Sequence, residues 1–182
     1  MNKKDTVMIT FDLSTSATGY TVFVNAIELF GGTFDLSKRK ISSDVRFAEM
    51  KEKILNLIRT YKPQIIVVEN PIYKKDPKAF GMLKELMGIV EGVALFHNIF
   101  YWSYVPSAWH KWAKDEDEQV PKTREELKRW SINKYKMAHG KEPYDDNHAD
   151  SYLIGIAYVN QMNYYLMLAD DEDLELELED IE

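Results

Sequence analysis

The sequence predicts an α/β fold, with one mixed five-stranded sheet and helices on both of its faces. Three strand-like segments open the chain, and two further apolar runs, at residues 64–70 and 100–106, are separated by segments with helical periodicity. Strands that follow one another through short turns pair antiparallel, whereas strands joined through a helix pair parallel. The two kinds of connection together indicate a mixed sheet.

Residues 6–36 account for the antiparallel part of this sheet. Residues 6–13 mix β-branched and apolar side chains and predict a buried strand that ends near Asp12. The small-residue turn STSATG follows, in which Gly19 is expected to give the backbone freedom to turn. The segments YTVFVN and AIELFGGTFDL predict the second and third strands.

Two helices are expected on either side of the apolar run at 64–70. Residues 43–60 carry apolar side chains at helical spacing, and Pro63 ends that helix. Pro77 can begin the second helix, which continues through residue 98 with an apolar face. This helix contains three glycines, which lower helix propensity and are expected to mark close packing. They are Gly81, Gly88 and Gly92.

Three more helices are expected after the strand at 100–106. Residues 107–113 indicate a short helix, and a charged loop follows. Residues 123–140 predict a basic helix that Gly140 closes. Residues 145–168 predict a long, strongly apolar last helix.

The charge of the chain is distributed unevenly between a body and a tail. The 182 residues carry a formal net charge of −7, but residues 170–182 hold nine of the 30 acidic residues and no lysine or arginine. The remaining body therefore has a slight basic excess, and the net charge does not exclude a nucleic-acid partner. We expect one domain over residues 1–169 and an acidic, disordered tail over residues 170–182.

The composition also disfavours several classes of protein. The chain has no cysteine, which excludes disulfides, thiolate metal sites and cysteine nucleophiles and fits a reducing cytoplasm. No segment reaches the roughly 18 apolar residues of a membrane span, and the first residues lack the apolar stretch of a signal peptide. We expect a cytoplasmic protein with no membrane partner.

Acidic side chains interrupt the apolar pattern of three predicted core elements. Asp12 follows VMITF and Glu69 follows IIVV, so each lies at the carboxyl end of a strand, where α/β sheets place ligand sites. Asp150 lies within the apolar last helix, and Asp146 is one turn earlier on the same face. Buried carboxylates require a compensating cation, and oxygen ligands favour Mg²⁺ or Mn²⁺.

Most of these acids also have a simpler structural interpretation. Asp12 precedes Ser-Thr and can be a turn residue, and Glu69 can belong to a buried ion pair. One residue of Asp145–Asn147 can cap the last helix, whereas Asp150 lies too far into that helix to do so. Four acids at two strand ends and on one helix face are hard to explain by accident, so we expect a metal site.

The ordered motifs FDLSTSATGY, VVEN, VPSAW and DDNHADSYLIG resemble the RuvC family of Holliday-junction resolvases, in particular compact phage-encoded relatives. The resemblance implies a ribonuclease-H-like fold and a metal-dependent, structure-selective endonuclease that resolves branched DNA and leaves 5′-phosphate ends. It implies two Mg²⁺ or Mn²⁺ ions in each active site. The catalytic ligands that carry over are Asp12, Glu69 and Asp150, with Asp146 as the fourth ligand or Asn147 in its place.

The same resemblance implies where DNA and a second subunit bind. It places a wedge and neighbouring lysines just after Glu69, a basic set around residues 110–136 that includes His110, and a homodimer formed through the glycine-marked helix. A phage-encoded protein of this family would work in the host cytoplasm. An ordinary solvated loop and a solvated basic helix face remain the simpler alternatives. The expected DNA contacts are Ile72, Tyr73, Lys74, Lys75, Lys111, Lys122 and Lys128.

Two other functions fit part of the sequence. A branched-DNA-binding or assembly factor would have the same fold without cleavage, although the retained acids argue against it. The turn DLSTSATG also resembles the first phosphate loop of actin-like ATPases and sugar kinases. Those enzymes close two such domains on a nucleotide, whereas 182 residues supply one. A nicking assay on synthetic junctions distinguishes the nuclease from both alternatives.

Overall fold

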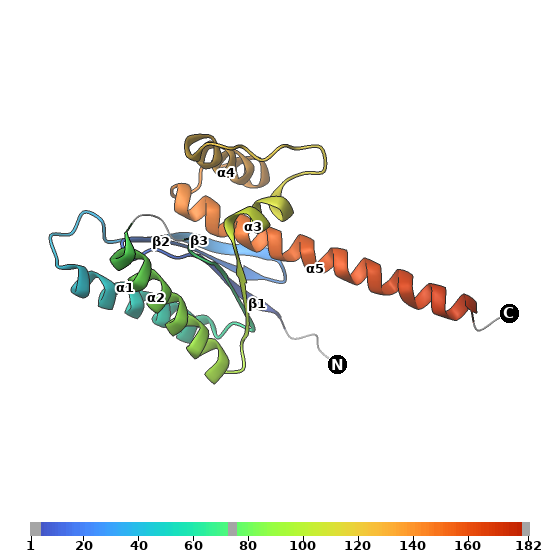
Figure 1. The fold of residues 1–182 in the computed structure, drawn as a ribbon, viewed down its shortest axis with the longest axis horizontal. Helices are drawn as coiled ribbons and strands as arrows, with labels where there is room; N and C mark the ends of the chain where they lie inside the picture. The colour runs from blue at the N-terminus through green and yellow to red at the C-terminus, as the bar shows by residue number, and fades with distance from the viewer. Residues whose placement is uncertain (1–4, 73–75, 180–182) are drawn as a thin grey trace.

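A five-stranded mixed sheet forms the centre of the protein in this computed structural model, which describes residues 5–72 and 76–179 (Figure 1). The spatial order of the strands is β3-β2-β1-β4-β5. β1 pairs antiparallel with β2, and β2 with β3, whereas β1 pairs parallel with β4, and β4 with β5. The predicted mixed sheet is therefore confirmed. The strands are β1 (Val7–Asp12), β2 (Ala17–Val24), β3 (Ile27–Asp35), β4 (Ile65–Glu69) and β5 (Phe100–Tyr104).

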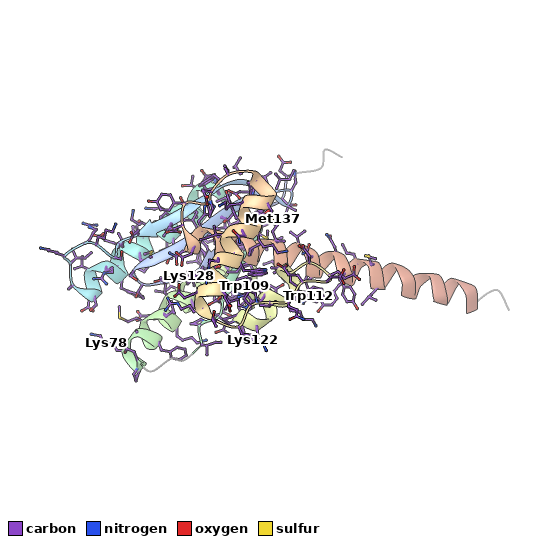
Figure 2. The ribbon with its side chains drawn as sticks, turned by 90° about the horizontal axis from the view of Figure 1, so that it is seen from above. Lys78, Trp109, Trp112, Lys122, Lys128 and Met137 are labelled. Atoms are coloured by element: carbon purple, nitrogen blue, oxygen red, sulfur yellow. The ribbon has the colours of Figure 1, made fainter. Side chains whose placement is uncertain are left out.

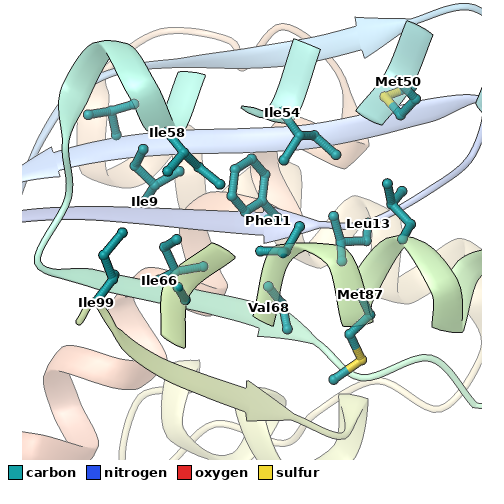
Figure 3. Packing of buried hydrophobic residues seen from close by; sticks show 14 of the residues in the cluster. Ile9, Phe11, Leu13, Met50, Ile54, Ile58, Ile66, Val68, Met87 and Ile99 are labelled. Carbon is teal, nitrogen blue, oxygen red and sulfur yellow. The ribbon is translucent and has the colours of Figure 1, made fainter. Parts of the chain in front are cut away.

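Helices cover both faces of this sheet and follow the predicted order. α1 and α2 pack on one face, while α5 crosses the other face with α3 and α4 against it (Figure 1). Each face has its own apolar core, and Figure 3 shows the core between the sheet, α1 and α2. The helices are α1 (Ser43–Tyr61), α2 (Pro77–Phe96), α3 (Pro106–Ala113), α4 (Arg124–His139) and α5 (Asp146–Glu179).

Local sequence signals explain where most of the helices begin and end. The Asp76 side chain accepts the first backbone N–H groups of α2, with Pro77 at its first position. Thr123 and Glu126 form a capping box at the start of α4. Gly140 ends α4 in the left-handed conformation, at φ 65°, as predicted.

Gly19 has a different role from the one expected. It does not adopt a positive φ, so the turn does not need its conformational freedom. A Cβ atom at Gly19 would lie 1.9 Å from the carbonyl oxygen of Asn147, and a Cβ atom at Gly31 would lie 2.1 Å from Nε2 of His148. These two glycines of β2 and β3 therefore let the first turn of α5 lie directly on the sheet.

The three glycines of α2 do not mark close packing among the described residues. A Cβ atom at Gly81, Gly88 or Gly92 would meet nothing within 4 Å. The C-terminal end of α2 exposes Leu95 by 67% and Phe96 by 82%. The glycine-bearing face of α2 is therefore an open surface on this chain.

α5 continues further than the sequence analysis expected. It runs to Glu179 and projects beyond the sheet (Figure 1), so the backbone of residues 170–179 is helical where disorder was predicted. Leucine and glutamate both have high helix propensity, which explains why this acidic run can extend the helix. The domain boundary at residue 169 stays a prediction. No helix among the described residues is long and apolar enough to span a membrane.

Candidate metal centre

The predicted acids line one cleft of about 490 Å³ at the carboxyl edge of β1 and β4. Asp12 comes from β1, Glu69 from β4, and Asp146 and Asp150 from the first turns of α5. Asn147, the alternative fourth ligand, lines the same cleft. The cleft is bounded on its other sides by residues of α2, α3 and α4.

The sheet register brings the two strand acids together. Phe11 pairs with Val68 across the parallel β1 and β4, so Asp12 and Glu69 each follow by one residue at the same edge. Because parallel strands end at one edge of a sheet, side chains at their carboxyl ends converge there. This explains how residues 57 positions apart line one cleft.

The N-cap of α5 does not use the side chain of Asp146, which stays available to the cleft. Thr33 on β3 donates its hydroxyl hydrogen to Oδ1 of Asp145 at 2.5 Å. The same oxygen accepts the backbone N–H of His148 at 2.9 Å, which is the capping bond of a helix N-terminus. Asp145 is therefore the capping residue among the three candidates, and Asp146 and Asp150 face the cleft one turn apart.

Burial and mutual repulsion oppose the simultaneous ionisation of the acids of the cleft. Burial raises the pKa of Asp12 well above its usual value, and the charges of Glu69 and Asp150 raise it further. Burial likewise raises the pKa of Asp150 to about 7, and Glu69 and Asp146 add to the rise. A divalent cation would reduce this repulsion, and it prefers the oxygen ligands that the cleft offers. Among the described residues, no group of three such side chains is already arranged around a common ion position.

Two neutral or basic groups already contact these acids. Nζ of Lys128 on α4 lies 2.5 Å from Oδ2 of Asp146. The indole Nε1 of Trp109 on α3 donates to Oε2 of Glu69 at 2.7 Å. Figure 2 labels Trp109 and Lys128 in the centre of the molecule, and both line the cleft.

Solved structures of Holliday-junction resolvases have a similar fold. RuvC of T. thermophilus in complex with a Holliday junction substrate matches with a TM-score of 0.67 and 13% identity, over 87% of this chain and 96% of that chain. The chain has the RuvC fold. The yeast mitochondrial Holliday junction resolvase Ydc2 matches with a TM-score of 0.60 and 17% identity, over 91% of this chain and 84% of that chain. No family model and no curated protein sequence matches.

The ribonuclease-H-like fold expected from the sequence is thus confirmed, and the cleft lies within this fold. A second structure of Thermus thermophilus RuvC matches with a TM-score of 0.65 and 14% identity, over 87% of this chain and 96% of that chain. The roles of Asp12, Glu69, Asp146 and Asp150 as metal ligands stay a prediction, which their convergence supports.

The residues predicted to bind DNA lie at different distances from the cleft of this RuvC fold. Ile72 lines the cleft and is 55% exposed. Lys128 also lines it, whereas Lys111 and Lys122 are exposed and lie outside the cleft lining. Their DNA contacts stay predictions. The remaining three, Tyr73, Lys74 and Lys75, lie outside the described residues.

Two cleft residues carry roles that the sequence analysis missed. His110 was included in the basic set, but burial lowers its pKa to about 4, so it is neutral at pH 7. Trp109 was not among the predicted site residues, yet its N–H contacts Glu69. The motif VPSAW places a tryptophan near the cleft, but no sequence signal predicts the direction of its N–H.

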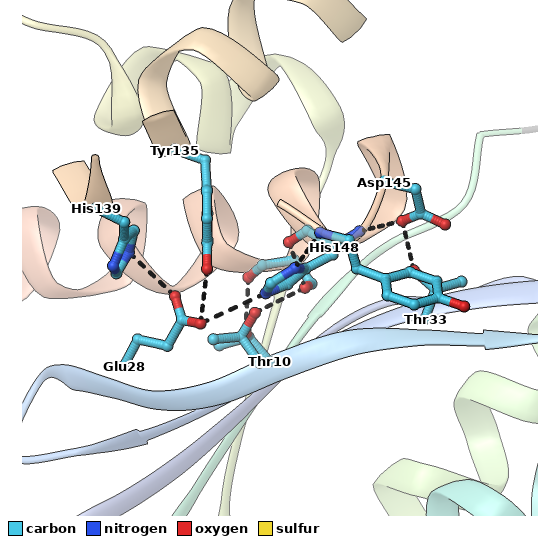
Figure 4. A network of polar contacts seen from close by, with 10 residues as sticks. Thr10, Glu28, Thr33, Tyr135, His139, Asp145 and His148 are labelled. Atoms are coloured by element: carbon cyan, nitrogen blue, oxygen red, sulfur yellow. Dashed lines mark hydrogen bonds and ion pairs between the residues drawn. The ribbon is translucent and has the colours of Figure 1, made fainter. Parts of the chain in front are cut away.

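A network of buried polar side chains links α5 to β3 and α4 (Figure 4). Glu28 of β3 accepts the hydroxyl hydrogen of Tyr135 at 3.0 Å, and its carboxylate lies 3.1 Å from Nε2 of His139 and 3.5 Å from Nε2 of His148. Burial acts to raise the pKa of Glu28, but His148 and Tyr135 hold it below its usual value. His148 therefore anchors α5 to β3.

The tautomer of His148 follows from its second contact. Its Nδ1 accepts the backbone N–H of Tyr144 at 3.0 Å, so the proton of the neutral ring lies on Nε2 and faces Glu28. An Nε2 atom that carries a proton has no lone pair for a metal ion. Glu28, His139 and His148 therefore form a network of close polar contacts, in which Nε2 of His148 is not free to bind a metal ion.

Proposed function

We propose that this protein is a divalent-metal-dependent endonuclease that resolves Holliday junctions and other branched DNA. The observation that supports this most strongly is the convergence of four carboxylates in one cleft of a RuvC fold. The similar T. thermophilus RuvC was solved with a Holliday junction substrate, and the similar yeast protein is a Holliday junction resolvase.

The carboxylates have the composition needed to hold two Mg²⁺ or Mn²⁺ ions. Asp12, Glu69, Asp146 and Asp150 would hold the ions, with Asn147 able to replace Asp146. When bound, the ions supply an activated water nucleophile and offset the charge that develops on the leaving 3′ oxygen. The chain contributes acids that the sheet edge and the α5 N-cap hold in place before DNA arrives. The expected products carry 5′-phosphate ends.

Lys128 has two roles in this proposal. In the absence of metal its ammonium group pairs with Asp146 and reduces the repulsion among the acids. A bound ion would neutralise Asp146, and the Lys128 side chain would then be available to a DNA phosphate at the edge of the cleft.

The proposal is tested by cleavage of synthetic DNA. The wild-type protein should nick four-way and three-way junctions when Mg²⁺ is present, should leave a linear duplex of the same sequence intact, and should lose activity in EDTA. Binding of junctions without any metal-dependent nicking would instead identify a non-cleaving assembly factor. Hydrolysis of a nucleotide without DNA would favour the kinase-like alternative.

The exposed lysines outside the cleft provide a prediction about DNA binding. Replacing Lys122 by Ala should weaken binding of a four-way junction and lower the slope of log Kd against log salt concentration by about 1, because one phosphate contact is lost. Binding is measured in EDTA at several salt concentrations. Lys62, an exposed lysine at the end of α1 and away from the cleft, provides the control Lys62→Ala. Equal slopes for the two variants and the wild type would remove Lys122 from the DNA surface.

A homodimer formed through α2 fits the proposed substrate, because a junction with two-fold symmetry requires two related active sites. The glycine face of α2 is open and is continuous with the exposed Leu95 and Phe96. Such an apolar, small-residue surface allows two helices to approach closely. The dimer is part of the proposal.

Gly88 allows the dimer to be tested without damage to the subunit. Replacing Gly88 by Arg should produce a monomer of 21.3 kDa in sedimentation, whereas the wild type should sediment at twice that mass. No atom lies within 4 Å of the position of the new Cβ, and arginine favours helix by close to 1 kcal/mol over glycine. Thermal stability should therefore be retained. A variant that still dimerises would place the interface elsewhere.

A further inference from the structure

Trp109 makes a directed contact with one of the four acids of the cleft. Its ring is 2% exposed, and its Nε1 donates to Oε2 of Glu69 at 2.7 Å. An indole N–H can only donate a hydrogen bond, and a bond to a carboxylate is stronger than one between neutral groups. The contact therefore ties one carboxylate oxygen of Glu69 to a rigid ring.

The ring itself is fixed by the sheet that carries Glu69. Glu69 at the end of β4 pairs with Tyr104 at the end of β5. The next backbone N–H, that of Asn70, donates to the carbonyl oxygen of Tyr104 at 2.6 Å. Pro106 then starts α3, which brings Trp109 back over the end of β4. The positions of donor and acceptor are thus set by two adjacent, hydrogen-bonded strand ends.

Aromatic packing further restricts the indole. The ring of Trp109 stacks on Trp130 of α4 with 6.2 Å between centroids, and its centroid lies 3.9 Å from that of His110. A buried ring with neighbours on these sides keeps one orientation. Glu69, in contrast, has a flexible side chain whose ordering costs conformational entropy. A hydrogen bond from a fixed donor orders the Glu69 side chain before a ligand binds, so ligand binding does not have to supply this entropy cost.

We propose that Trp109 is a positioning residue, which holds the Glu69 carboxylate in the orientation that binds a divalent cation and so raises the metal affinity of the cleft. This inference rests on the metal dependence of the proposed function. Partners that orient metal ligands in this way contribute about 10- to 100-fold to metal affinity. Trp109 itself does not touch the ion or the DNA in this role.

The chain contains a matched control for this contact. Nε1 of Trp130 donates to Oε1 of Glu118 at 2.7 Å, the same distance and the same pair of groups. Trp130 belongs to the same aromatic cluster and is also buried, at 8% exposure. Glu118, however, does not line the cleft and pairs instead with Lys134. Comparing the two tryptophans separates orientation of a metal ligand from packing.

The experiment measures Mn²⁺ binding by calorimetry in the absence of DNA, together with thermal unfolding. Trp109→Phe, which keeps an aromatic ring but removes the N–H, should bind Mn²⁺ about 10- to 100-fold more weakly than the wild type. Trp130→Phe keeps an aromatic ring against Trp109 and loses only the N–H bond to Glu118, so it should bind Mn²⁺ as the wild type does, while losing a comparable amount of thermal stability. Equal Mn²⁺ affinity of Trp109→Phe and the wild type would show that Trp109 only packs, and would overturn the inference.

A second variant distinguishes the loss of the N–H from a loss of packing. Benzothienylalanine at position 109 has the two-ring shape of tryptophan with sulfur in place of the N–H. It should retain the thermal stability of the wild type and lose the same Mn²⁺ affinity as Trp109→Phe. Wild-type affinity in this variant would also overturn the inference, because the ring alone would then suffice.

A double-mutant cycle identifies Glu69 as the route of the effect. In a Glu69→Gln background, Trp109→Phe should cause little or no further loss of Mn²⁺ affinity, since the carboxylate that it orients is gone. Losses that add independently would contradict the proposed route.

The binding measurement also separates this inference from the proposed function. If the wild type binds Mn²⁺ and Trp109→Phe binds it more weakly, the inference holds even if no branched DNA is cleaved. If the wild type takes up no Mn²⁺, the metal-dependent function and this inference both fail.

Discussion

Asp150→Asn should abolish metal-dependent cleavage of branched DNA and, at the same time, make the metal-free protein more stable. The substitution removes one of the charges that would hold the catalytic ions, and stabilisation by such ions is worth several kcal/mol of the barrier. We therefore expect a loss of about 10³-fold or more in the nicking rate at saturating Mg²⁺. The thermal stability should rise because a buried carboxylate with a raised pKa opposes folding at neutral pH.

The two opposite effects are measured on the same preparation. Nicking of a labelled four-way junction gives the activity, and thermal unfolding in EDTA at pH 7.5 gives the stability. The control Asp115→Asn changes an exposed aspartate that pairs with Lys134, as Glu118 also does, so its activity and stability should stay close to those of the wild type. Equal nicking by Asp150→Asn and the wild type would contradict the metal site. A lower melting temperature would contradict the repulsion within it.

Local apolar patterns were enough to predict the order of the ten elements, because the helices bury one face and the central strands bury both. The run Ile65–Val68 is continuous and apolar, which is typical of a central parallel strand, and it lies between β1 and β5. Once β1 and β4 are parallel neighbours, Asp12 and Glu69 necessarily end at the same edge. The convergence of the strand acids was therefore predictable from local patterns.

Contacts between distant segments were not predictable in this way. Three adjacent residues could each cap α5, and Thr33, which lies 112 positions earlier, decides in favour of Asp145. The glycines of α2 were expected to mark close packing, but glycine composition does not tell whether the neighbour belongs to the same chain. The contact of Trp109 with Glu69 was not predictable either, because the direction of its N–H depends on how α3 folds back over β4.

Whether a buried acid has a raised or a lowered pKa likewise depends on the groups that surround it. The Glu28 side chain is also largely buried, at 5% exposure, but two histidines and the Tyr135 hydroxyl surround it. Its pKa is consequently lowered, whereas those of Asp12 and Asp150 are raised by burial and by one another. The sequence predicted the buried acids of the cleft but not Glu28, and the packing shows for which buried carboxylates neighbours in the chain lower the pKa.

Those raised pKa values predict that the metal-free protein becomes less stable as the pH rises from 5 to 8. A carboxyl group whose pKa is higher in the folded state than in the unfolded state stabilises the fold below its unfolded pKa, and this contribution is lost as the pH rises through the folded pKa. For Asp150 the window runs from its usual value of 3.8 to about 7. This corresponds to a contribution on the order of 4 kcal/mol. The Ser131 hydroxyl and the Lys128 ammonium oppose the shift but do not cancel it.

Divalent metal should remove most of this pH dependence. Because an ion binds the ionised acids of the folded state, its stabilising effect grows as the acids lose their protons. Thermal unfolding of the wild type from pH 5 to 8 should therefore show a falling melting temperature in EDTA and a much flatter profile in 10 mM Mg²⁺, taken as about 100 times Kd. In EDTA, Asp150→Asn should already have the flatter profile. A wild-type protein that gains stability with rising pH in EDTA would show that the acids of the cleft do not destabilise the fold by mutual repulsion. Their charges would then not favour the binding of a cation.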